Sequence, residues 1–497
     1  MEGEGQMVSL RSPMIHIAEE NGFGCNGKRR VEKGFKRDEI TEEVRRQLWL
    51  ALPLISVCLL QYLLQIISVM VVGHLGQLPL SGASMANAFA SVTGFDFLIG
   101  MASALDTLCG QSYGAKHYHM LGVHMQRAML VLSLVSIPIA VIWANTGSIL
   151  TAAHQDPDIA REAQVYAQYM IPSLFAYGLL QCLGRFLQTQ KSVFPMMISS
   201  GITTLLHLPV CWLLVFKLGL GIKGAALANC FSYWVNVLLL VLYVKFSPLC
   251  VKTWTGFSRD ALRDTFTFLR LAFPSALMVC LEMWSYELMV LLSGLLPNPK
   301  LESSVLSISL NTAAAVWMIA LGQSSAVSTR VSNELGAGHP EAAQRAVWVV
   351  LMMAIAKGIV VGIIMILLRD IWGYAYSNET EVVRYVANMM PILALSNLLD
   401  GVQCVLSGIA RGSGWQKIGA VINLGSYYIV GIPAAIVLAF VLHIGGRGLW
   451  LGIILALIVQ VTFFLVITFR TNWEQEASKA KERVCAYEIP VHMQSLK

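Results

Sequence analysis

Long apolar segments dominate the pattern of hydrophobic and polar positions along the 497-residue chain. Each reaches or exceeds the length of about 20 residues that an α-helix needs to cross a bilayer, at ~1.5 Å per residue. Short connections that carry glycine, proline or a charged residue separate most of them. The pattern predicts twelve membrane-spanning helices, at residues 47–72, 83–109, 124–149, 160–189, 195–218, 224–246, 265–296, 303–329, 343–368, 380–410, 416–440 and 446–470.

The composition supports this prediction. Hydrophobic residues make up 56% of the chain and charged residues only 13%, whereas an average soluble domain has about 25% charged residues. Lipid offers no hydrogen-bond partner to an open sheet edge, so apolar helices are the expected solution. We therefore predict an all-α polytopic membrane protein.

The two ends of the chain are polar. The first 45 residues contain a basic cluster between Lys28 and Arg37 and lack the apolar stretch of a signal peptide. We expect a disordered cytosolic tail at 1–45, with contact between its basic residues and anionic lipid as a further option. The domains expected next are an N-lobe at 46–246, a cytosolic linker at 247–264, a C-lobe at 265–471 and a cytosolic tail at 472–497.

Lysine and arginine are distributed unevenly over the connections. If both termini are cytosolic, most of the 35 basic residues fall on the cytosolic side, and Lys357 falls within a span. This asymmetry predicts an even number of spans with both termini inside. The basic residues expected outside are Arg161, Lys217, Lys223, Lys300, Arg369, Arg384 and Arg447. The same topology places the sequon at Asn378 on the outer side.

The chain contains an internal repeat with an offset of about 218 to 224 residues. Leu50-Ala-Leu-Pro53 recurs as Leu271-Ala-Phe-Pro274, Gly114-Ala-Lys-His117 as Gly336-Ala-Gly-His339, and Gly221-Ile-Lys-Gly224 as Gly445-Gly-Arg-Gly448. Each half thus carries six helices in the same orientation. A pseudo-two-fold axis along the membrane normal, with a cavity between two lobes, is the transporter arrangement that follows.

Two carboxylates lie near the middle of predicted spans. Glu282 and Asp400 each add roughly 2.5–3.5 kcal/mol to the insertion free energy, so such residues normally face a protein interior or a wet cavity. Our hypothesis is that both bind protons or substrate; the alternative is a structural acid neutralised by one interhelical partner. Asn397 and Gln403 share a helix face with Asp400 and are candidate hydrogen-bond partners.

Other polar and aromatic residues within the spans are weaker candidates. Asn311, Trp317 and Gln323 are expected to line the cavity, with structural packing as the alternative. Tyr286 lies one turn from Glu282, whereas Glu287 points away and is expected to have a separate structural partner. Stacking on a planar substrate is a further option for Trp284, Tyr177 and Tyr286, although aromatic residues also fill helix interfaces. A structural role is expected for His207 and an anchoring role for Asp106, and Lys357 has only the general expectation of a neighbouring partner.

The repeat also assigns counterparts to the two acids. Glu282 corresponds to Gln61 and Asp400 to Gln181. An amide hydrogen-bonds much as a protonated acid does but does not titrate. We therefore predict that proton coupling belongs to the C-half, while Gln61 and Gln181 give the N-half a fixed polar surface for substrate.

Several chemistries have no signal in the sequence. The ten cysteines show no Cys-x-x-Cys spacing, and the chain has no Gly-x-x-x-x-Gly-Lys-Ser/Thr loop, nucleophile elbow or zinc motif. We expect no enzyme activity, no cofactor and no bound metal. An ion gradient is then the expected energy source.

Three motifs resemble a known family. Arg330-Val-Ser-Asn-Glu-Leu-Gly-Ala-Gly338, Val72-Gly-His-Leu-Gly76 and Arg411-Gly-Ser-Gly-Trp-Gln416 are similar to plant-type multidrug and toxic compound extrusion (MATE) transporters, over about residues 40–475. The resemblance implies a V of two six-helix lobes that exports organic compounds in exchange for protons. The family's seventh-helix glutamate and tenth-helix aspartate match Glu282 and Asp400. Ser68 stands where prokaryotic relatives often carry an acid, so the implied sites do not extend to an N-lobe proton or sodium site.

Together these observations predict a proton-coupled antiporter. Its substrates would be organic, cationic or amphipathic compounds, moved from the cytosol to the cell exterior or the vacuole across the plasma or vacuolar membrane. A lipid or lipid-linked flippase of the same plan is the alternative, whereas a receptor or scaffold leaves the repeat and the buried acids unexplained. We expect a monomer whose partners are the lipid bilayer, protons and a small organic substrate, without nucleic acid.

Overall fold

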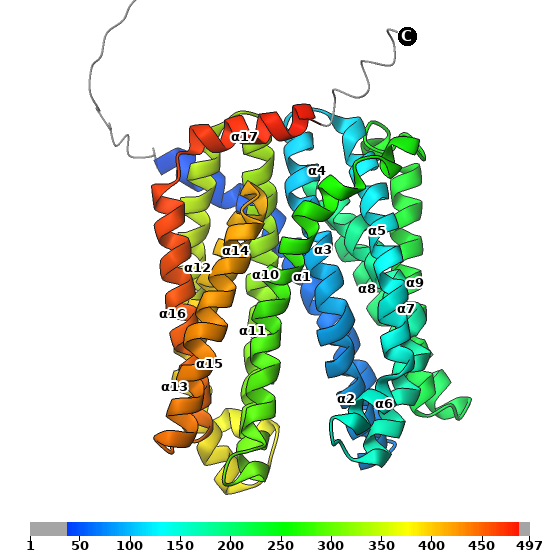
Figure 1. The fold of residues 1–497 in the computed structure, drawn as a ribbon, viewed down its shortest axis with the longest axis vertical. Coiled ribbons are helices and arrows are strands. Elements are labelled where there is room, and N and C mark those ends of the chain that lie inside the picture. The colour runs from blue at the N-terminus through cyan, green and yellow to red at the C-terminus, as the bar shows by residue number, and fades with distance from the viewer. Residues whose placement is uncertain (1–36, 487–497) are drawn as a thin grey trace, which may run out of the picture. The chain divides into compact units, whose positions relative to one another are not determined.

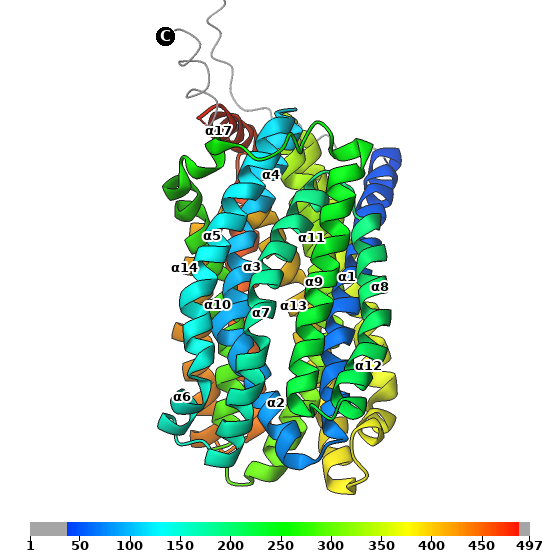
Figure 2. The same ribbon diagram turned by 90° about the vertical axis from the view of Figure 1, so that its right-hand side faces the viewer.

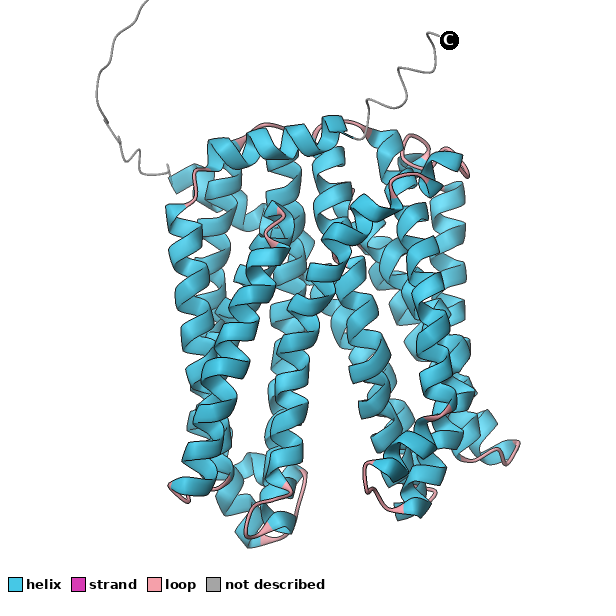
Figure 3. Cartoon of the chain, viewed as in Figure 1, coloured by secondary structure: helices cyan, strands magenta, loops and turns pink. Residues whose placement is uncertain are grey.

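Helices make up almost all of the computed structural model, which describes residues 37–486. Twelve of its helical stretches are long and apolar enough to span a membrane, and each coincides with one of the twelve predicted segments. No strand occurs within residues 37–486 (Figure 3). The α-helices are α1 Arg37–Gly73, α2 Gln77–Ala90, α3 Asp96–Ala102, α4 Ala104–Gly114, α5 Tyr118–Ala144, α6 Thr146–Ala152, α7 Pro157–Thr189, α8 Phe194–Trp212, α9 Ile222–Phe246, α10 Thr265–Ser293, α11 Pro299–Gly336, α12 Pro340–Trp372, α13 Thr380–Ser413, α14 Gln416–Asn423, α15 Ile432–Ile436, α16 Gly446–Arg470 and α17 Trp473–Ala486.

Short π-helical segments interrupt several spans. They are η1 Ser91–Phe95, η2 Leu213–Lys217, η6 Leu424–Gly431 and η7 Val437–Val441. Since η2 and η7 begin and end 224 residues apart, the repeat extends to these irregularities. Gly221 and Gly445 follow them with φ angles of 55° and 67°, which favour glycine because it has no Cβ. The recurring glycines thus mark the same turn in both halves.

The helices form two lobes (Figures 1 and 2). Helices α1–α9 share one continuous buried core, which also takes in the start of α10. Helices α10–α16 enclose two further apolar clusters. The ribbons of the two lobes diverge away from the end of the bundle that carries α17 (Figure 1). We call the end with α17 the closed end, because the lobes are joined there by the polar contacts described below.

Glycines allow the lobes to approach closely, in pairs that obey the repeat. A Cβ on Gly114 of α4 would lie 2.0 Å from the Asn333 carbonyl oxygen on α11, and a Cβ on Gly336 would lie 2.1 Å from the Gln111 carbonyl oxygen. Gly114 and Gly336 are equivalent positions of the repeat, as are Gln111 and Asn333, so the two contacts are equivalent across the two halves. The pseudo-two-fold axis therefore passes through the crossing of α4 and α11.

The structure corrects the end of the predicted N-terminal tail and shows a helix within the C-terminal one. Residues 37–45 are the first turns of α1 rather than part of a disordered tail, and residues 1–36 lie outside the described part. At the other end, Trp473–Ala486 forms α17, which lies across the closed end (Figure 1), and residues 487–497 are not described. Trp473 and Ala477 belong to the C-lobe core. The linker contains two 3₁₀ turns, Pro248–Cys250 and Arg259–Leu262.

Candidate functional site

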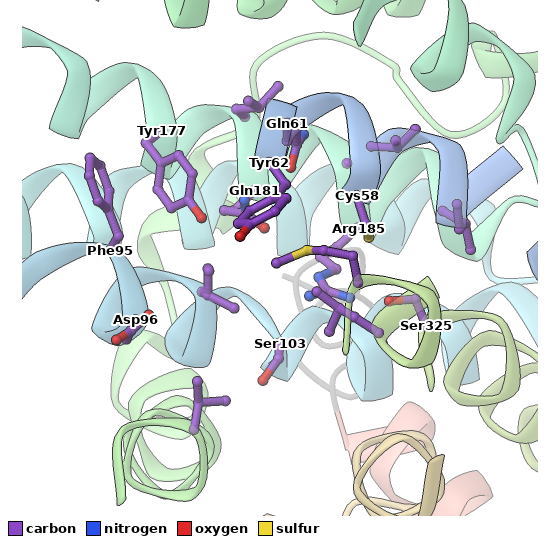
Figure 4. A pocket seen from close by; sticks show the side chains of 18 of the residues that line it. Cys58, Gln61, Tyr62, Phe95, Asp96, Ser103, Tyr177, Gln181, Arg185 and Ser325 are labelled. Atoms are coloured by element: carbon purple, nitrogen blue, oxygen red, sulfur yellow. The ribbon is translucent and has the colours of Figure 1, made fainter. Parts of the chain in front are cut away.

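A cavity of about 250 Å³ lies between the two lobes. It is lined from the N-lobe by α1, α3, α7, α8 and α9, and from the C-lobe by α10, α11 and α13. Figure 4 shows Gln61, Tyr62 and Gln181 close together on one wall, with Arg185 farther along. Of the residues proposed from the sequence, Glu282, Trp317, Gln61, Gln181 and Tyr177 line this cavity.

Glu282 reaches the cavity from the middle of α10, and its side chain is 6% exposed. Its Oε2 accepts a hydrogen bond of 2.8 Å from Nε2 of Gln403 on α13, which also donates to the Ser407 hydroxyl at 2.9 Å. One turn before Glu282, the Met278 carbonyl accepts from Nδ2 of Asn423 at 2.6 Å. No cation forms an ion pair with Glu282 within the described residues. The carboxyl group is thus hydrogen-bonded by one neutral amide, that of Gln403, beside a cavity.

Asp400 lies behind this site rather than in the cavity wall. It is 8% exposed on α13, and its Oδ1 has no hydrogen-bond partner among the described residues. It interacts electrostatically with Glu282 and with Lys357 of α12. The Lys357 ammonium packs against α13 at Gly401, where an added Cβ would be 2.9 Å from Nζ. Lys357, which the sequence left unassigned, is therefore the nearby positive charge for Asp400.

The remaining sequence candidates lie outside the cavity wall. Asn397 donates to the Met365 sulfur at 3.2 Å, and Gln403 donates to Glu282, so neither fills the proposed role of a partner for Asp400. Tyr286 packs in the C-lobe core with its ring 6.4 Å from that of Tyr427. Gln323 is buried and Asn311 is exposed, and neither lines the cavity.

A buried ion cluster joins the lobes near the closed end. Asp106 of α4 is fully buried, with its Oδ2 at 3.3 Å from Nη1 of Arg185 on α7 and 3.5 Å from Nε of Arg411 on α13. Arg411 also donates to the Ser324 hydroxyl at 2.7 Å. One carboxylate therefore faces two guanidinium groups, one from each lobe. This extends the anchoring role expected of Asp106.

A second charged contact links the lobes at the same end. Arg330 of α11 donates to both carboxylate oxygens of Glu43 on α1, at 3.0 and 2.8 Å. Arg483 of α17 donates to Gln111 Oε1 of the N-lobe at 2.9 Å and to the Ser413 carbonyl of the C-lobe at 3.0 Å. Fork-shaped guanidinium contacts of this kind fix geometry as well as charge. The motif that begins at Arg330 thus holds the two lobes together.

A cluster of neutral polar side chains lies in the interior of the N-lobe, around His207. Nε2 of His207 lies 2.9 Å from the Ser68 hydroxyl and Nδ1 lies 2.8 Å from the Ser232 hydroxyl. Ser68 also donates to Oδ1 of Asn229 at 2.9 Å, and Asn229 donates to the Tyr166 hydroxyl at 3.0 Å. His207 is a hydrogen-bonded interior histidine, in the role expected from the sequence.

Sequence reasoning missed three charged residues of the cavity: Asp96, Arg185 and Arg411. Asp96 carries the signal that identified Glu282 and Asp400, a carboxylate inside an apolar segment. Arg185 and Arg411 lie toward the ends of predicted spans, where basic residues are ordinary. Only the fold shows that both reach Asp106.

Comparison with known proteins identifies the family. A family model described as MatE matches residues 53–213 and 274–437, one segment in each lobe. The chain belongs to the MATE family of transporters. Two MATE relatives from Arabidopsis thaliana are Protein DETOXIFICATION 16, 66% identical with 90% of this chain and 92% of that protein covered, and Protein DETOXIFICATION 17, 61% identical with 91% and 95% covered. The family resemblance noted in the sequence is confirmed.

Solved structures agree with this assignment. The eukaryotic MATE transporter AtDTX14 is 47% identical, with a TM-score of 0.87 over 90% of this chain and all of that chain. A point mutant of the MATE transporter VcmN from Vibrio cholerae shares the fold at 14% identity, with a TM-score of 0.79 over 88% of this chain and all of that one. The protein is thus a multi-pass membrane transporter rather than an enzyme, and residues 37–486 contain twelve membrane-spanning helices in two six-helix lobes.

Proposed function

We propose that this MATE transporter is a proton-coupled antiporter that exports organic, cationic or amphipathic compounds from the cytosol. The observation that carries the proposal is Glu282, a buried carboxyl group that borders the interlobe cavity and is hydrogen-bonded by the neutral amide of Gln403. Burial disfavours the charged form of an acid that no cation neutralises. A proton and an organic cation are then alternative ways to neutralise the same group.

Exchange follows from this competition. A cationic compound binds beside ionised Glu282, and a proton from the acidic side removes the charge and weakens cation binding. The Gln403 amide and Ser407 connect Glu282 to α13, which also carries Asp400 and Arg411. A change of charge at Glu282 therefore alters the contacts of α13 within the C-lobe and, through Arg411, the ion cluster at Asp106. Movement of one lobe against the other then exposes the cavity to the opposite side.

The direction of export rests on the distribution of basic residues. We infer that both termini, and therefore the closed end, face the cytosol, because most lysines and arginines lie on that side. Polar interlobe contacts at this end support a conformation closed to the cytosol. The acceptor compartment is the cell exterior or the vacuole, and the protein acts as a monomer.

Transport into proteoliposomes under imposed gradients tests the proposal. Uptake of an organic cation should follow a pH gradient and ignore a sodium gradient at fixed pH. Ser68 lies among the neutral side chains of His207 and Asn229, and residues 37–486 contain no cluster of three or more acidic, histidine or cysteine side chains to hold a hard cation such as sodium. Uptake driven by sodium at symmetrical pH would contradict proton coupling.

A lipid flippase remains the second candidate, and one observation favours it. Arg185 and Arg411 line the cavity and carry more positive charge than Asp106 neutralises. Transfer of a fluorescent anionic phospholipid between leaflets, measured in the same vesicles, distinguishes the two. Lipid transfer without gradient-driven uptake of cations would replace the antiporter proposal.

A further inference from the structure

Asp96 is a carboxylate of the N-lobe cavity wall that takes no part in the proton exchange proposed for Glu282. It is the first residue of α3, directly after the π-helical segment η1, and it lines the cavity between the lobes. Its side chain forms no hydrogen bond or ion pair with the rest of residues 37–486. A carboxylate that borders a cavity inside the membrane and lacks a partner is available to a ligand.

The backbone around Asp96 is held tightly. A Cβ on Gly94 would lie 2.7 Å from the Trp143 ring, and Trp143 Nε1 donates to the Thr93 hydroxyl at 3.0 Å. From the other lobe, Trp284 Nε1 donates to the Val92 carbonyl at 3.0 Å. Segments of this π-helical kind occur frequently at functional sites. The position of Asp96 is therefore fixed by both lobes.

Aromatic rings form the wall beside Asp96. The ring centroids of Phe95 and Tyr177 are 4.6 Å apart, and those of Tyr177 and Tyr233 are 5.5 Å apart. All three rings line the cavity, and Figure 4 shows Phe95, Tyr177 and Asp96 on the same side of it, away from Arg185. Aromatic faces attract cations and stack on planar molecules.

A second carboxylate adds negative charge to this place. Glu287 of α10 interacts electrostatically with Asp96 across the interface between the lobes. It is half-buried, lies three residues after Trp284 on the same helix, and forms no ion pair within the described residues. Glu287 was expected to have a structural partner of its own. Instead, it has no ion-pair partner within the described residues, and its negative charge adds to that of Asp96 from the opposite lobe.

We propose that Asp96 is the anchor for the positive charge of a planar aromatic cation, which stacks against Phe95, Tyr177 and Tyr233 while Glu287 adds attraction from the other lobe. The positive charge of the substrate is then recognised mainly by Asp96 in the N-lobe, whereas Glu282 in the C-lobe exchanges the proton. The inference rests on the proposed export of organic cations. To that function it adds Asp96 as the residue that selects for positive charge, and it specifies that the exported cation is planar and aromatic.

Binding of two probes to the purified protein tests this directly. The probes are 10-methylacridinium, a planar fluorescent cation, and 10-methylacridone, a neutral compound of similar size and shape. Asp96→Asn should lower the binding affinity for the cation by about tenfold, or roughly 1.4 kcal/mol, and leave the affinity for the neutral probe unchanged. Glu287→Gln should lower the affinity for the cation by a smaller factor, because Glu287 does not line the cavity. Asp96→Glu should retain most of the cation affinity.

The control is Asp370→Asn, which removes an exposed acid near the end of α12, outside the cavity between the lobes, and should leave the binding of both probes unchanged. Glu282→Gln should also weaken binding of the cation, because Glu282 borders the same cavity. Unchanged preference for the cation in Asp96→Asn would overturn the proposal, as would an equal loss of cation affinity in Asp370→Asn. If Asp96→Asn elutes as an aggregate, Asp96→Ser replaces it with the same expectations. The assay measures equilibrium binding without a gradient. A negative result would therefore contradict the role of Asp96 but would leave proton coupling to be tested by transport.

Discussion

The buried ion cluster at Asp106 gives a prediction whose size follows from the geometry. Asp106→Asn keeps the shape of the side chain but leaves Arg185 and Arg411 buried with no carboxylate, where the wild type has Oδ2 at 3.3 and 3.5 Å from the two guanidinium groups. Removing one partner of a buried ion pair costs about 3–5 kcal/mol. Because Arg411 comes from the other lobe, much of this cost falls on the closed arrangement of the bundle.

Two measurements follow from that free energy. The melting temperature of the purified protein should fall, and the closed end should open more often, by roughly a hundredfold to a few thousandfold if the whole cost falls there. Opening is measured as the labelling rate of a cysteine introduced at Ser413, a fully buried position at the closed end, with the exposed Cys485 replaced.

The matched control is Asp260→Asn in the linker. Its partner Arg263 lies 3.4 Å away, but the two side chains are 42% and 50% exposed. Such surface pairs contribute ~0–1 kcal/mol, so neither the melting temperature nor the labelling rate should change appreciably. The account of the closed end is refuted if Asp106→Asn behaves like Asp260→Asn in both assays.

Two further predictions concern the cavity and its surroundings. Replacing Gln61 or Gln181 with Ala should change the apparent substrate affinity more than the pH profile of transport, since both amides line the cavity and neither titrates; an abolished pH dependence would contradict the assignment. Lys357→Met and Asp400→Asn should each lower thermal stability, while the double variant should lose less than the sum of the two, because it removes both buried charges together. Additive losses in that double-mutant cycle would show that the two residues do not interact.

Much of the fold is readable in the sequence because lipid imposes simple rules. Every span must be apolar over a fixed length, so twelve segments stood out, and recurring prolines and glycines such as Pro53 and Pro274 exposed the repeat. Helix α17 was read only as a polar tail, because an amphipathic helix that rests on the bundle has no long apolar run. Its docking residue Trp473 has a partner only once the C-lobe is assembled.

The site was predicted less completely, for a different reason. A charge within a span is conspicuous, which identified Glu282 and Asp400, and the repeat identified Gln61 and Gln181. Which amide meets which acid depends on helix rotation and on the neighbouring helix. Gln403 thus bonds Glu282 on α10 rather than Asp400 on its own helix. Contacts between lobes, such as Arg411 with Asp106, are set by how two separate bundles meet.

The central claim is that Glu282 exchanges protons against substrate. Its most direct test is transport of 10-methylacridinium in proteoliposomes, titrated against external pH, for the wild type and Glu282→Gln. The variant keeps size and hydrogen-bonding capacity toward Gln403 but does not titrate. We expect near-background transport in the variant, with a flat pH profile in whatever activity remains. Wild-type rates with an unchanged pH dependence would contradict it.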